Sequence, residues 1–197
     1  MEVLNFNHNL FDKFLTNKIS KFLDNDTTCL VIGIKEGGMP LAEIVAQKLQ
    51  SYTSEKVDLV GVICQRSSTK IKKNKRTRFI LKKGLNILPE LLLNKLRVLE
   101  HSILINNKDL HRDIFIPNDI DYLKYDKILI VDDAVDSGAT LKKVLEGINK
   151  YINSDINITT LSVVVTDTKA SIIPDYYLYS DVLIRFPWSL DGQKSNF

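Results

Sequence analysis

Hydrophobic residues recur along the chain in two alternating patterns. Short and almost continuous apolar runs, whose length and content predict strands, cover residues 29–34, 58–64, 127–133, 158–166 and 180–186. Apolar residues that recur every three or four positions, which predicts amphipathic helices, cover residues 10–23, 41–49 and 141–152. Apolar strands that alternate with helices are typical of a parallel sheet covered on both faces, so we expect an α/β fold.

The segment between the second and third predicted strands is longer than one connection of such a fold needs. In it Pro89 suits the first turn of a helix, and an apolar stripe follows at helical spacing. The stripe consists of Leu92, Leu96, Leu99 and Ile103. It would pack on the sheet or on a second copy of the chain; the alternative is an apolar face toward a membrane surface or a lipid-linked substrate.

Charge changes this picture, because it is unevenly distributed along the chain. The whole chain has a formal net charge of +3, yet no acidic residue occurs between Leu59 and Pro89. The basic block consists of Arg66, Lys70, Lys72, Lys73, Lys75, Arg76, Arg78, Lys82 and Lys83. Such a block attracts an anionic partner, the alternative being a solvated loop.

Cysteine usage and apolar runs bear on the compartment. Cys29 and Cys64 both fall in predicted strands, so no disulfide framework is implied and a reducing setting fits. The N-terminal residues lack the pattern of a signal peptide, and no apolar run is long enough to span a membrane. We therefore expect a cytoplasmic protein, which would lie at the inner face of the membrane if the apolar stripe binds lipid.

The first predicted strand leads into a glycine-rich turn, GIKEGGMP, at residues 33–40. Glycines permit close backbone approach, and backbone N–H groups at the start of a helix bind anions. Neither a Walker sequence nor a dinucleotide fingerprint is present. On its own this pattern indicates either an anion site or only a tight turn.

The third predicted strand ends on two acids, Asp132 and Asp133, and the loop 136–140 follows. The small and hydroxyl residues of this loop open a helix, whose free N–H groups and dipole suit a phosphate. Two carboxylates suit hydroxyls or a cation instead. A ribose 5-phosphate satisfies both halves. A receiver domain, which also ends a strand on paired acids, and a metal site without phosphate are the alternatives.

Three motifs resemble those of one family. ILIVDDAVDSGATL, at residues 128–141, resembles the signature of type I phosphoribosyltransferases, and VIGIKEGGMPLA, at 31–42, resembles their pyrophosphate loop. SDVLIRFPW, at 180–188, is similar to the hood strand of the purine-salvage members. The resemblance implies one domain over 1–197, with a mostly parallel sheet flanked by helices. It also implies a basic and helical insertion at 66–125 and a small C-terminal hood at 167–197.

The same resemblance implies roles for individual residues toward the donor, 5-phosphoribosyl 1-pyrophosphate (PRPP). Its catalytic residues would be Asp132, Asp133 and Asp136: the first two accept hydrogen bonds from the ribose hydroxyls, and the third is the general base. The residues implied to bind the 5-phosphate are Asp136, Ser137, Gly138, Ala139 and Thr140. Those implied to bind pyrophosphate are Lys35, Glu36, Gly37, Gly38, Arg66, Ser67 and Lys70.

Magnesium is the implied cofactor. It would be bound mainly through PRPP, with Asp132 and Asp133 as contacts through water, and it would neutralise the leaving group. One position departs from the family pattern, because many bacterial members carry arginine where Glu36 stands. An acid there repels pyrophosphate, so either Lys35 supplies the charge or Glu36 points away.

The acceptor is the open question. The basic block beside an apolar stripe favours a sugar hydroxyl on a lipid-linked glycan, in the biosynthesis of ribofuranose-containing polysaccharide. The alternative is purine salvage, with hypoxanthine, guanine or xanthine packing on Trp188. A third hypothesis is a non-catalytic regulator that senses PRPP and binds nucleic acid through the basic block. The lack of aromatic residues between Leu59 and Arg78 argues against that third hypothesis.

The remaining residues of interest are interpreted as structural. His8, His101 and His111 show no ligand spacing, so we interpret them as surface or helix residues. Tyrosines 176, 177 and 179 adjoin the last predicted strand and are expected to pack there, the alternative being that one of them lines the acceptor pocket. A homodimer is expected from the resemblance.

Overall fold

The computed structural model describes residues 1–22, 27–66, 89–106, 112–153, 156–189 and 191–192. Most of the basic block lies outside these residues, and so do the predicted pyrophosphate contacts Ser67 and Lys70. The elements, in chain order, are β1 (Glu2–Asn5), α1 (His8–Phe22), β2 (Cys29–Lys35), α2 (Gly38–Gln50), β3 (Val57–Arg66), α4 (Glu90–Asn106), β4 (Arg112–Phe115), the 3-10 helix η2 (Tyr122–Lys124), β5 (Lys127–Val135), α5 (Ala139–Ile148), β6 (Asn157–Val165), β7 (Tyr176–Ser180) and β8 (Val182–Arg185).

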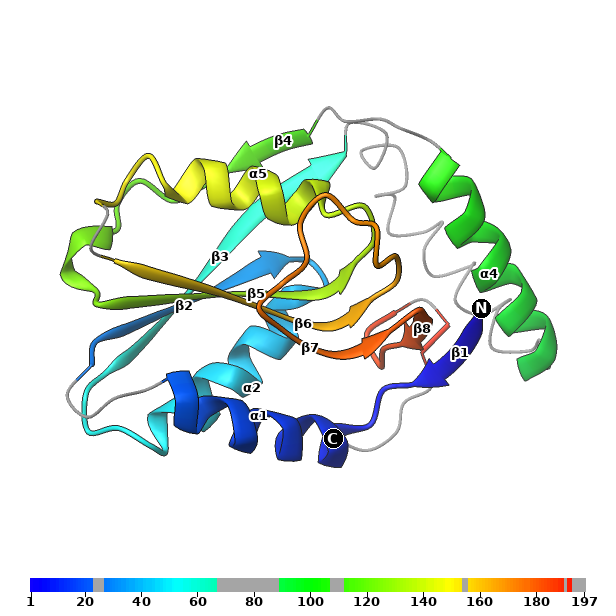
Figure 1. Ribbon diagram of the computed structural model, residues 1–197, viewed down its shortest axis with the longest axis horizontal. Helices are drawn as coiled ribbons and strands as arrows, with labels where there is room; N and C mark the ends of the chain where they lie inside the picture. Colours follow the sequence, from blue (N-terminus) through cyan, green and yellow to red (C-terminus); the bar gives the residue numbers. More distant parts are fainter. Residues whose placement is uncertain (23–26, 67–88, 107–111, 154–155, 190, 193–197) are drawn as a thin grey trace.

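A six-stranded sheet in the order β4-β3-β2-β5-β6-β7 forms the centre of the molecule (Figure 1). All its neighbouring strands run parallel except β4, which pairs antiparallel with β3. The predicted α/β fold with a mostly parallel sheet is therefore confirmed. Because β2 and β5 are adjacent and parallel, the loops that follow them emerge at the same edge of the sheet.

The strands bury both faces, as their continuous apolar sequences predict. In β2, Cys29 and Val31 face the cluster that contains α1 and α2, while Leu30 and Ile32 face the cluster that contains α5. This alternation follows from the two-residue period of a strand. The result is a three-layer arrangement with helices on both sides of the sheet (Figure 1).

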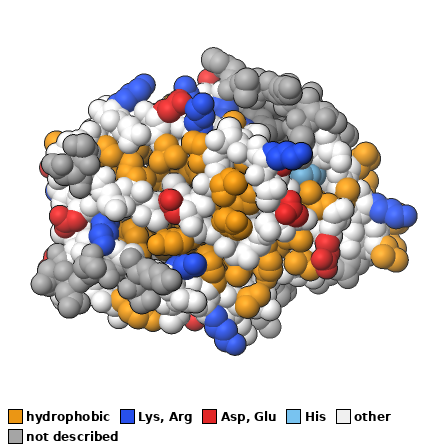
Figure 2. Space-filling model, in the orientation of Figure 1, with side chains coloured by type: hydrophobic (Ala, Val, Ile, Leu, Met, Phe, Trp, Pro, Cys, Tyr) orange, Lys and Arg blue, Asp and Glu red, His pale blue; other side chains and the backbone are white. Residues whose placement is uncertain are grey.

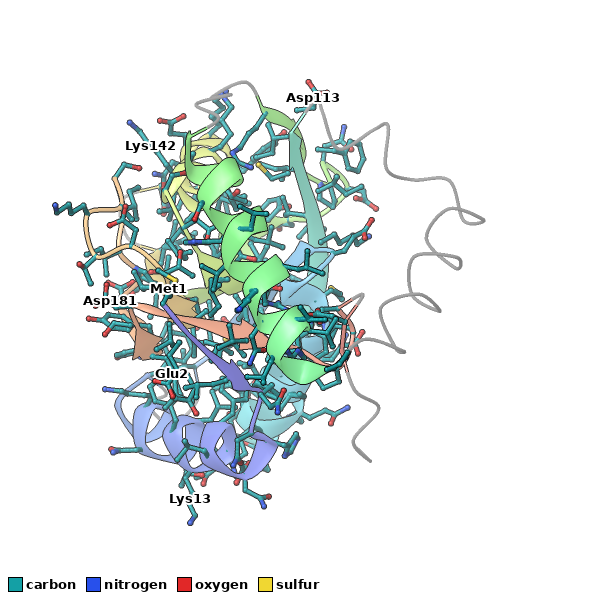
Figure 3. All side chains as sticks on the ribbon, turned by 90° about the vertical axis from the view of Figure 1, so that its right-hand side faces the viewer. Met1, Glu2, Lys13, Asp113, Lys142 and Asp181 are labelled. Atoms are coloured by element: carbon teal, nitrogen blue, oxygen red, sulfur yellow. The ribbon has the colours of Figure 1, made fainter. Side chains whose placement is uncertain are left out.

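The last predicted strand, 180–186, is divided between two sheets. Residues Tyr176–Ser180 form β7 at the edge of the main sheet, whereas β8 pairs in parallel with β1 in a separate two-stranded sheet. The sequence pattern did not indicate β1. Helix α4 lies in front of β1 and β8 (Figure 3), and β8 joins it through Arg97, whose Nη2 donates to the carbonyl of Ile184 at 2.7 Å.

Helix α4 confirms the predicted helix after Pro89 but not the packing of its apolar stripe on the sheet. Leu92, Leu96 and Leu99 are 47%, 46% and 58% exposed, while Leu93 and His101 are buried. Hydrophobic side chains, with charged ones between them, lie along the edge of the molecule where α4 runs (Figure 2). The side chain of Ile103 is outside the described part. Within the described ranges, no helix is both long and apolar enough to cross a lipid bilayer.

Candidate active site

The two predicted loops meet at the carboxyl ends of β2 and β5. A Cβ atom on Gly37 would overlap the carboxylate of Asp133, and one on Gly38 would stand 2.5 Å from the carbonyl oxygen of Val131. Glycine is therefore required sterically at both positions, because the turn after β2 lies directly against β5. The peptide bond between Lys35 and Glu36 is cis, and both side chains are exposed.

The paired acids at the end of β5 are held by the backbone. The N–H of Asp133 donates to Asp132 Oδ1 at 3.0 Å, and the N–H of Ala134 donates to Asp133 Oδ1 at 2.9 Å. Burial and the charge of Asp133 raise the pKa of Asp132 well above its usual value, and burial raises the pKa of Asp133 as well. Two crowded carboxylates of this kind favour a ligand that supplies hydroxyl hydrogens or positive charge.

These acids do not form a complete metal site with other protein ligands. Among the described residues, no three His, Cys, Asp or Glu side chains are grouped so that they could hold a metal ion by themselves. The oxygens of Asp132 and Asp133 suit Mg²⁺, which prefers few carboxylates together with water and substrate oxygens. The pair therefore fits a cation that arrives already bound to an anionic substrate.

The loop from Asp136 to α5 is fixed by contacts with the segment after β6. Gly138 has φ +76, and a Cβ there would stand 2.6 Å from the backbone nitrogen of Ile172. The carbonyl of Ser137 accepts hydrogen bonds from the N–H and the hydroxyl of Ser171, at 3.0 and 2.9 Å. Helix α5 begins at Ala139, so the loop ends on the N–H groups of a helix start, which suit a phosphate.

Asp136 takes part in a chain of side chains that the sequence did not indicate. Thr166 lies just beyond β6, and its hydroxyl donates to Asp136 Oδ1 at 2.6 Å. His101 Nε2 on α4 lies 3.0 Å from the same hydroxyl and 3.4 Å from Asp136 Oδ1. His101 is a helix residue, as predicted, but it does not lie on the surface, because its side chain is buried against the loop.

A cavity of about 340 Å³ opens beside Asp136, between α4 and β8. Most of its walls are apolar, and charged groups stand at a few places. Its lining consists of Leu93, Leu96, Arg97, His101, Asp133, Ala134, Asp136, Val164, Thr166, Leu183, Ile184, Phe186, Ser189 and Asp191. Arg97 Nη1 binds both oxygens of Asp191, at 2.6 and 2.7 Å, which fixes α4 to the C-terminal segment.

The sequence of the chain matches one family model over most of its length. Residues 7–193 match the family described as "Phosphoribosyl transferase domain". The chain belongs to the phosphoribosyltransferase family. Its paired acids, glycine turn and helix start thus occupy one edge of the sheet in a phosphoribosyltransferase, as the sequence resemblance implied.

Solved structures of purine phosphoribosyltransferases share this fold. A purine phosphoribosyltransferase from Pyrococcus horikoshii is 18% identical, covers 100% of this chain and 98% of its own, and has a TM-score of 0.59. The xanthine-guanine-hypoxanthine phosphoribosyltransferase of Helicobacter pylori is 19% identical, covers 96% and 95%, and has a TM-score of 0.57. A hypoxanthine phosphoribosyltransferase from Staphylococcus aureus is 10% identical, covers 87% and 71%, and has a TM-score of 0.53. No curated protein matches this phosphoribosyltransferase in sequence.

Most of the predicted site residues that the structure describes lie at this edge of the sheet. Two of the predicted residues, Arg66 and Trp188, are not seen to contact the site. Arg66 ends β3, and its side chain lies outside the described part. Trp188 stacks on Phe186, with ring centroids 5.0 Å apart, and also contacts Phe6. It is absent from the cavity lining, so in this geometry Trp188 packs behind the wall that Phe186 forms.

Sequence reasoning missed the residues that α4 brings to the cavity. Leu93, Arg97 and His101 lie four positions apart and form the face of α4 toward the site. A histidine at this spacing from a buried leucine was the available signal. The leucine stripe, one position away, is more apolar and therefore conceals this signal in the sequence.

Proposed function

We propose that this phosphoribosyltransferase transfers the 5-phosphoribosyl group of PRPP to a ring nitrogen of a purine base and releases pyrophosphate. The observation that carries this proposal is the cavity of about 340 Å³ beside Asp136. Ligand sites range from roughly 300 to 1,000 Å³, so this cavity suits a single flat base better than an oligosaccharide. Its walls combine apolar side chains, which can pack on a heteroaromatic ring, with polar groups that can bond the heteroatoms of that ring.

The donor would bind across the two loops that meet at the sheet edge. Asp132 and Asp133 would accept hydrogen bonds from the ribose hydroxyls. The N–H groups at the start of α5 would hold the 5-phosphate, and the turn at Gly37 would hold the pyrophosphate. Magnesium, bound to PRPP oxygens next to the paired acids, would supply positive charge that neutralises the pyrophosphate.

The reaction then follows from the positions of these groups. The bond between C1 of the ribose and the pyrophosphate oxygen breaks, and its electron pair leaves with pyrophosphate. A ring nitrogen of the base in the cavity forms the new bond to C1. The proton of that N–H passes to the carboxylate of Asp136, which lies on the cavity wall and acts as the general base.

The compared structures favour a purine acceptor over a glycan. Each reported neighbour is described as a purine, xanthine-guanine-hypoxanthine or hypoxanthine phosphoribosyltransferase. At 10–19% identity they share the fold rather than a demonstrated substrate, so hypoxanthine, guanine and xanthine are our proposal for this chain.

The test is Mg²⁺-dependent release of pyrophosphate from PRPP, measured with purines, pyrimidines and saccharides as acceptors. Release that requires hypoxanthine, guanine or xanthine, and that is lost in the Asp132→Asn plus Asp133→Asn double variant, is the expected result. Tight PRPP binding without release on any panel would overturn the proposal in favour of a PRPP-sensing regulator.

A lipid-linked glycan acceptor remains a second candidate because of one observation. Leu91, Leu92 and Leu99 expose a leucine surface on α4 that a purine does not need. Saccharide-dependent pyrophosphate release, reduced by Leu92→Gln plus Leu99→Gln only when the acceptor is lipid-linked, would support it. The reaction on a purine should not change in that double variant, since neither leucine lines the cavity.

A further inference from the structure

His101 reaches the site from a helix that plays no part in the proposed donor binding. Three distances connect it to the proposed base. Thr166 Oγ1 lies 2.6 Å from Asp136 Oδ1 and 3.0 Å from His101 Nε2, and His101 Nε2 lies 3.4 Å from Asp136 Oδ1. All three side chains line the same cavity, and Thr166 and His101 are 3% and 9% exposed.

The number of available hydrogens fixes the direction of these bonds. A threonine hydroxyl has one hydrogen, and Thr166 donates it to Asp136 Oδ1. Toward His101 the same oxygen can only accept, so His101 Nε2 must carry a hydrogen and donate it. The chain of donors therefore runs from His101 through Thr166 to Asp136 and ends on the carboxylate.

We propose that Thr166 and His101 are positioning residues for Asp136, which fix its carboxylate in the ionised form and in one orientation for proton abstraction from the acceptor. This inference rests on the proposed role of Asp136 as general base. Donors that reach a carboxylate favour its ionised form, and packing around them fixes its plane. A base must be both ionised and aligned before it can take a proton.

A purely structural role for this chain of bonds is a poor explanation. Helix α4 is already fixed to the C-terminal segment by Arg97, which binds Asp191 and the carbonyl of Ile184. Asn94 on the same helix accepts from Arg185. The His101 contacts instead end on Asp136, a carboxylate of the phosphate loop that also lines the cavity.

Strand β6 offers a matched control for Thr166. Thr160 is 4% exposed, and its hydroxyl donates to Asp175 Oδ2 at 2.7 Å, far from the cavity lining. Thr166→Val and Thr160→Val therefore remove equivalent buried hydroxyl–carboxylate bonds. We expect kcat for the purine reaction to fall roughly 10-fold to 100-fold in Thr166→Val, as for loss of a hydrogen bond to a charged group, and to stay unchanged in Thr160→Val.

The role of His101 is tested by variants that differ in one donor. His101→Gln keeps an N–H near the Nε2 position, whereas His101→Leu removes it. We expect Thr166→Ser and His101→Gln to retain most of kcat, and His101→Leu to lose as much as Thr166→Val. The KM for PRPP should change little in any of them, because neither Thr166 nor His101 belongs to the two loops proposed to bind PRPP.

The pH profile separates positioning from packing. When the donors to Asp136 are lost, the acid limb of kcat/KM should move to higher pH, since the ionised base is less favoured. The other charged groups of the cavity, Arg97, Asp133 and Asp191, stay in place in all variants. Equal kcat and equal profiles for Thr166→Val and Thr160→Val would overturn the proposal.

A readout without acceptor separates this proposal from the proposed function. The ring signals of His101 in an NMR spectrum, assigned by their absence in His101→Gln, should shift in Asp136→Asn and Thr166→Val but not in Thr160→Val. If these shifts occur but the wild-type protein uses no purine, the purine acceptor is refuted and the connection between His101 and Asp136 stands. Ring signals that do not respond to either variant would refute the connection between His101 and Asp136.

Discussion

Gly37 lies directly against Asp133, so that any side chain on Gly37 would overlap the carboxylate. The contact joins the turn after β2 to the end of β5, the two places where the donor is expected to bind. The backbone of Gly37 has φ −75, which any residue adopts, so the requirement for glycine comes from space alone.

Gly37→Ala should therefore damage donor binding more than folding. The Cβ would displace Asp133 from the ribose, and displacement of about 1 Å in such a site costs on the order of 100-fold in rate. We expect PRPP affinity, measured by calorimetry with Mg²⁺, to fall with little change in the unfolding midpoint. Gly147→Ala, where the Cβ would meet the flexible side-chain ends of Ile116 and Ile114 rather than a site residue, is the control. Unchanged PRPP affinity in Gly37→Ala would mean that the donor does not need this contact.

Asp132→Asn should stabilise the ligand-free protein at neutral pH while it abolishes activity. The pKa of Asp132 is raised in the folded state by burial and by Asp133, so the folded protein binds more protons than the unfolded chain. The free-energy cost of ionising Asp132 in the folded protein is absent below about pH 4, the pKa of the carboxyl in the unfolded chain, and grows as the pH rises above it. The variant should gain on the order of 1 kcal/mol at pH 8 and little at pH 4, measured by urea unfolding. A gain independent of pH would contradict this origin.

Asp191→Asn should weaken the attachment of α4 to the C-terminal segment. Burial alone would raise the pKa of Asp191, but the hydrogen bond and charge of Arg97 outweigh burial and lower that pKa. The stabilisation is therefore complete above about pH 4 and is lost as the pH falls through the lowered value. At pH 7 we expect a loss of about 2–3 kcal/mol in unfolding free energy, measured by denaturation with urea, because the pair is mostly buried.

The surface ion pair between Lys48 and Asp12, at 2.8 Å, is the matched control. Asp12 is 43% exposed, so Asp12→Asn should cost at most about 1 kcal/mol. If both variants lose the same amount, the Arg97–Asp191 pair does not act as a buried attachment of α4.

Gly138→Ala should impair the phosphate loop for two separate reasons. A positive φ costs a residue with Cβ about 1–2 kcal/mol, and the Cβ would also press on the backbone of Ile172. Gly138→Asn separates them, since asparagine tolerates this φ but still carries a Cβ. We expect Gly138→Asn to lose stability and PRPP affinity almost as much as Gly138→Ala, by thermal unfolding and calorimetry. Wild-type stability and PRPP affinity in Gly138→Asn would show that the backbone at Ile172 moves aside to accommodate the Cβ.

The loops and the main fold could be predicted from the sequence because their determinants are local. The acids at 132 and 133, the loop at 136–140 and the turn at 33–40 each follow a recognisable apolar strand, and parallel strands bring such ends together. Small residues at these places are required by backbone contacts, as Gly138 and Ile172 illustrate. Short-range pattern was therefore sufficient to place these two loops at one edge of the sheet.

The acceptor half could not be predicted, because it depends on contacts between distant segments. His101 meets Asp136 both directly, at 3.4 Å, and through Thr166, and Arg97 meets Asp191 across 94 residues of the chain. Nothing in the sequence near His101 reports these partners. The pairing of β1 with β8 was missed as well: β8 lies within the predicted strand 180–186, but the four residues of β1 are too few to show a periodicity.

The two halves of the site are thus encoded in different parts of the chain. The donor half comes from the ends of β2 and β5, whereas the cavity walls come largely from α4 and from the segment beginning at β8. Substitutions in α4 or after β8 can alter the chamber for the acceptor while the handling of PRPP persists. Helix α4 is therefore the element at which to begin a redesign of acceptor specificity, because four of its residues line the cavity and none belongs to the two donor loops.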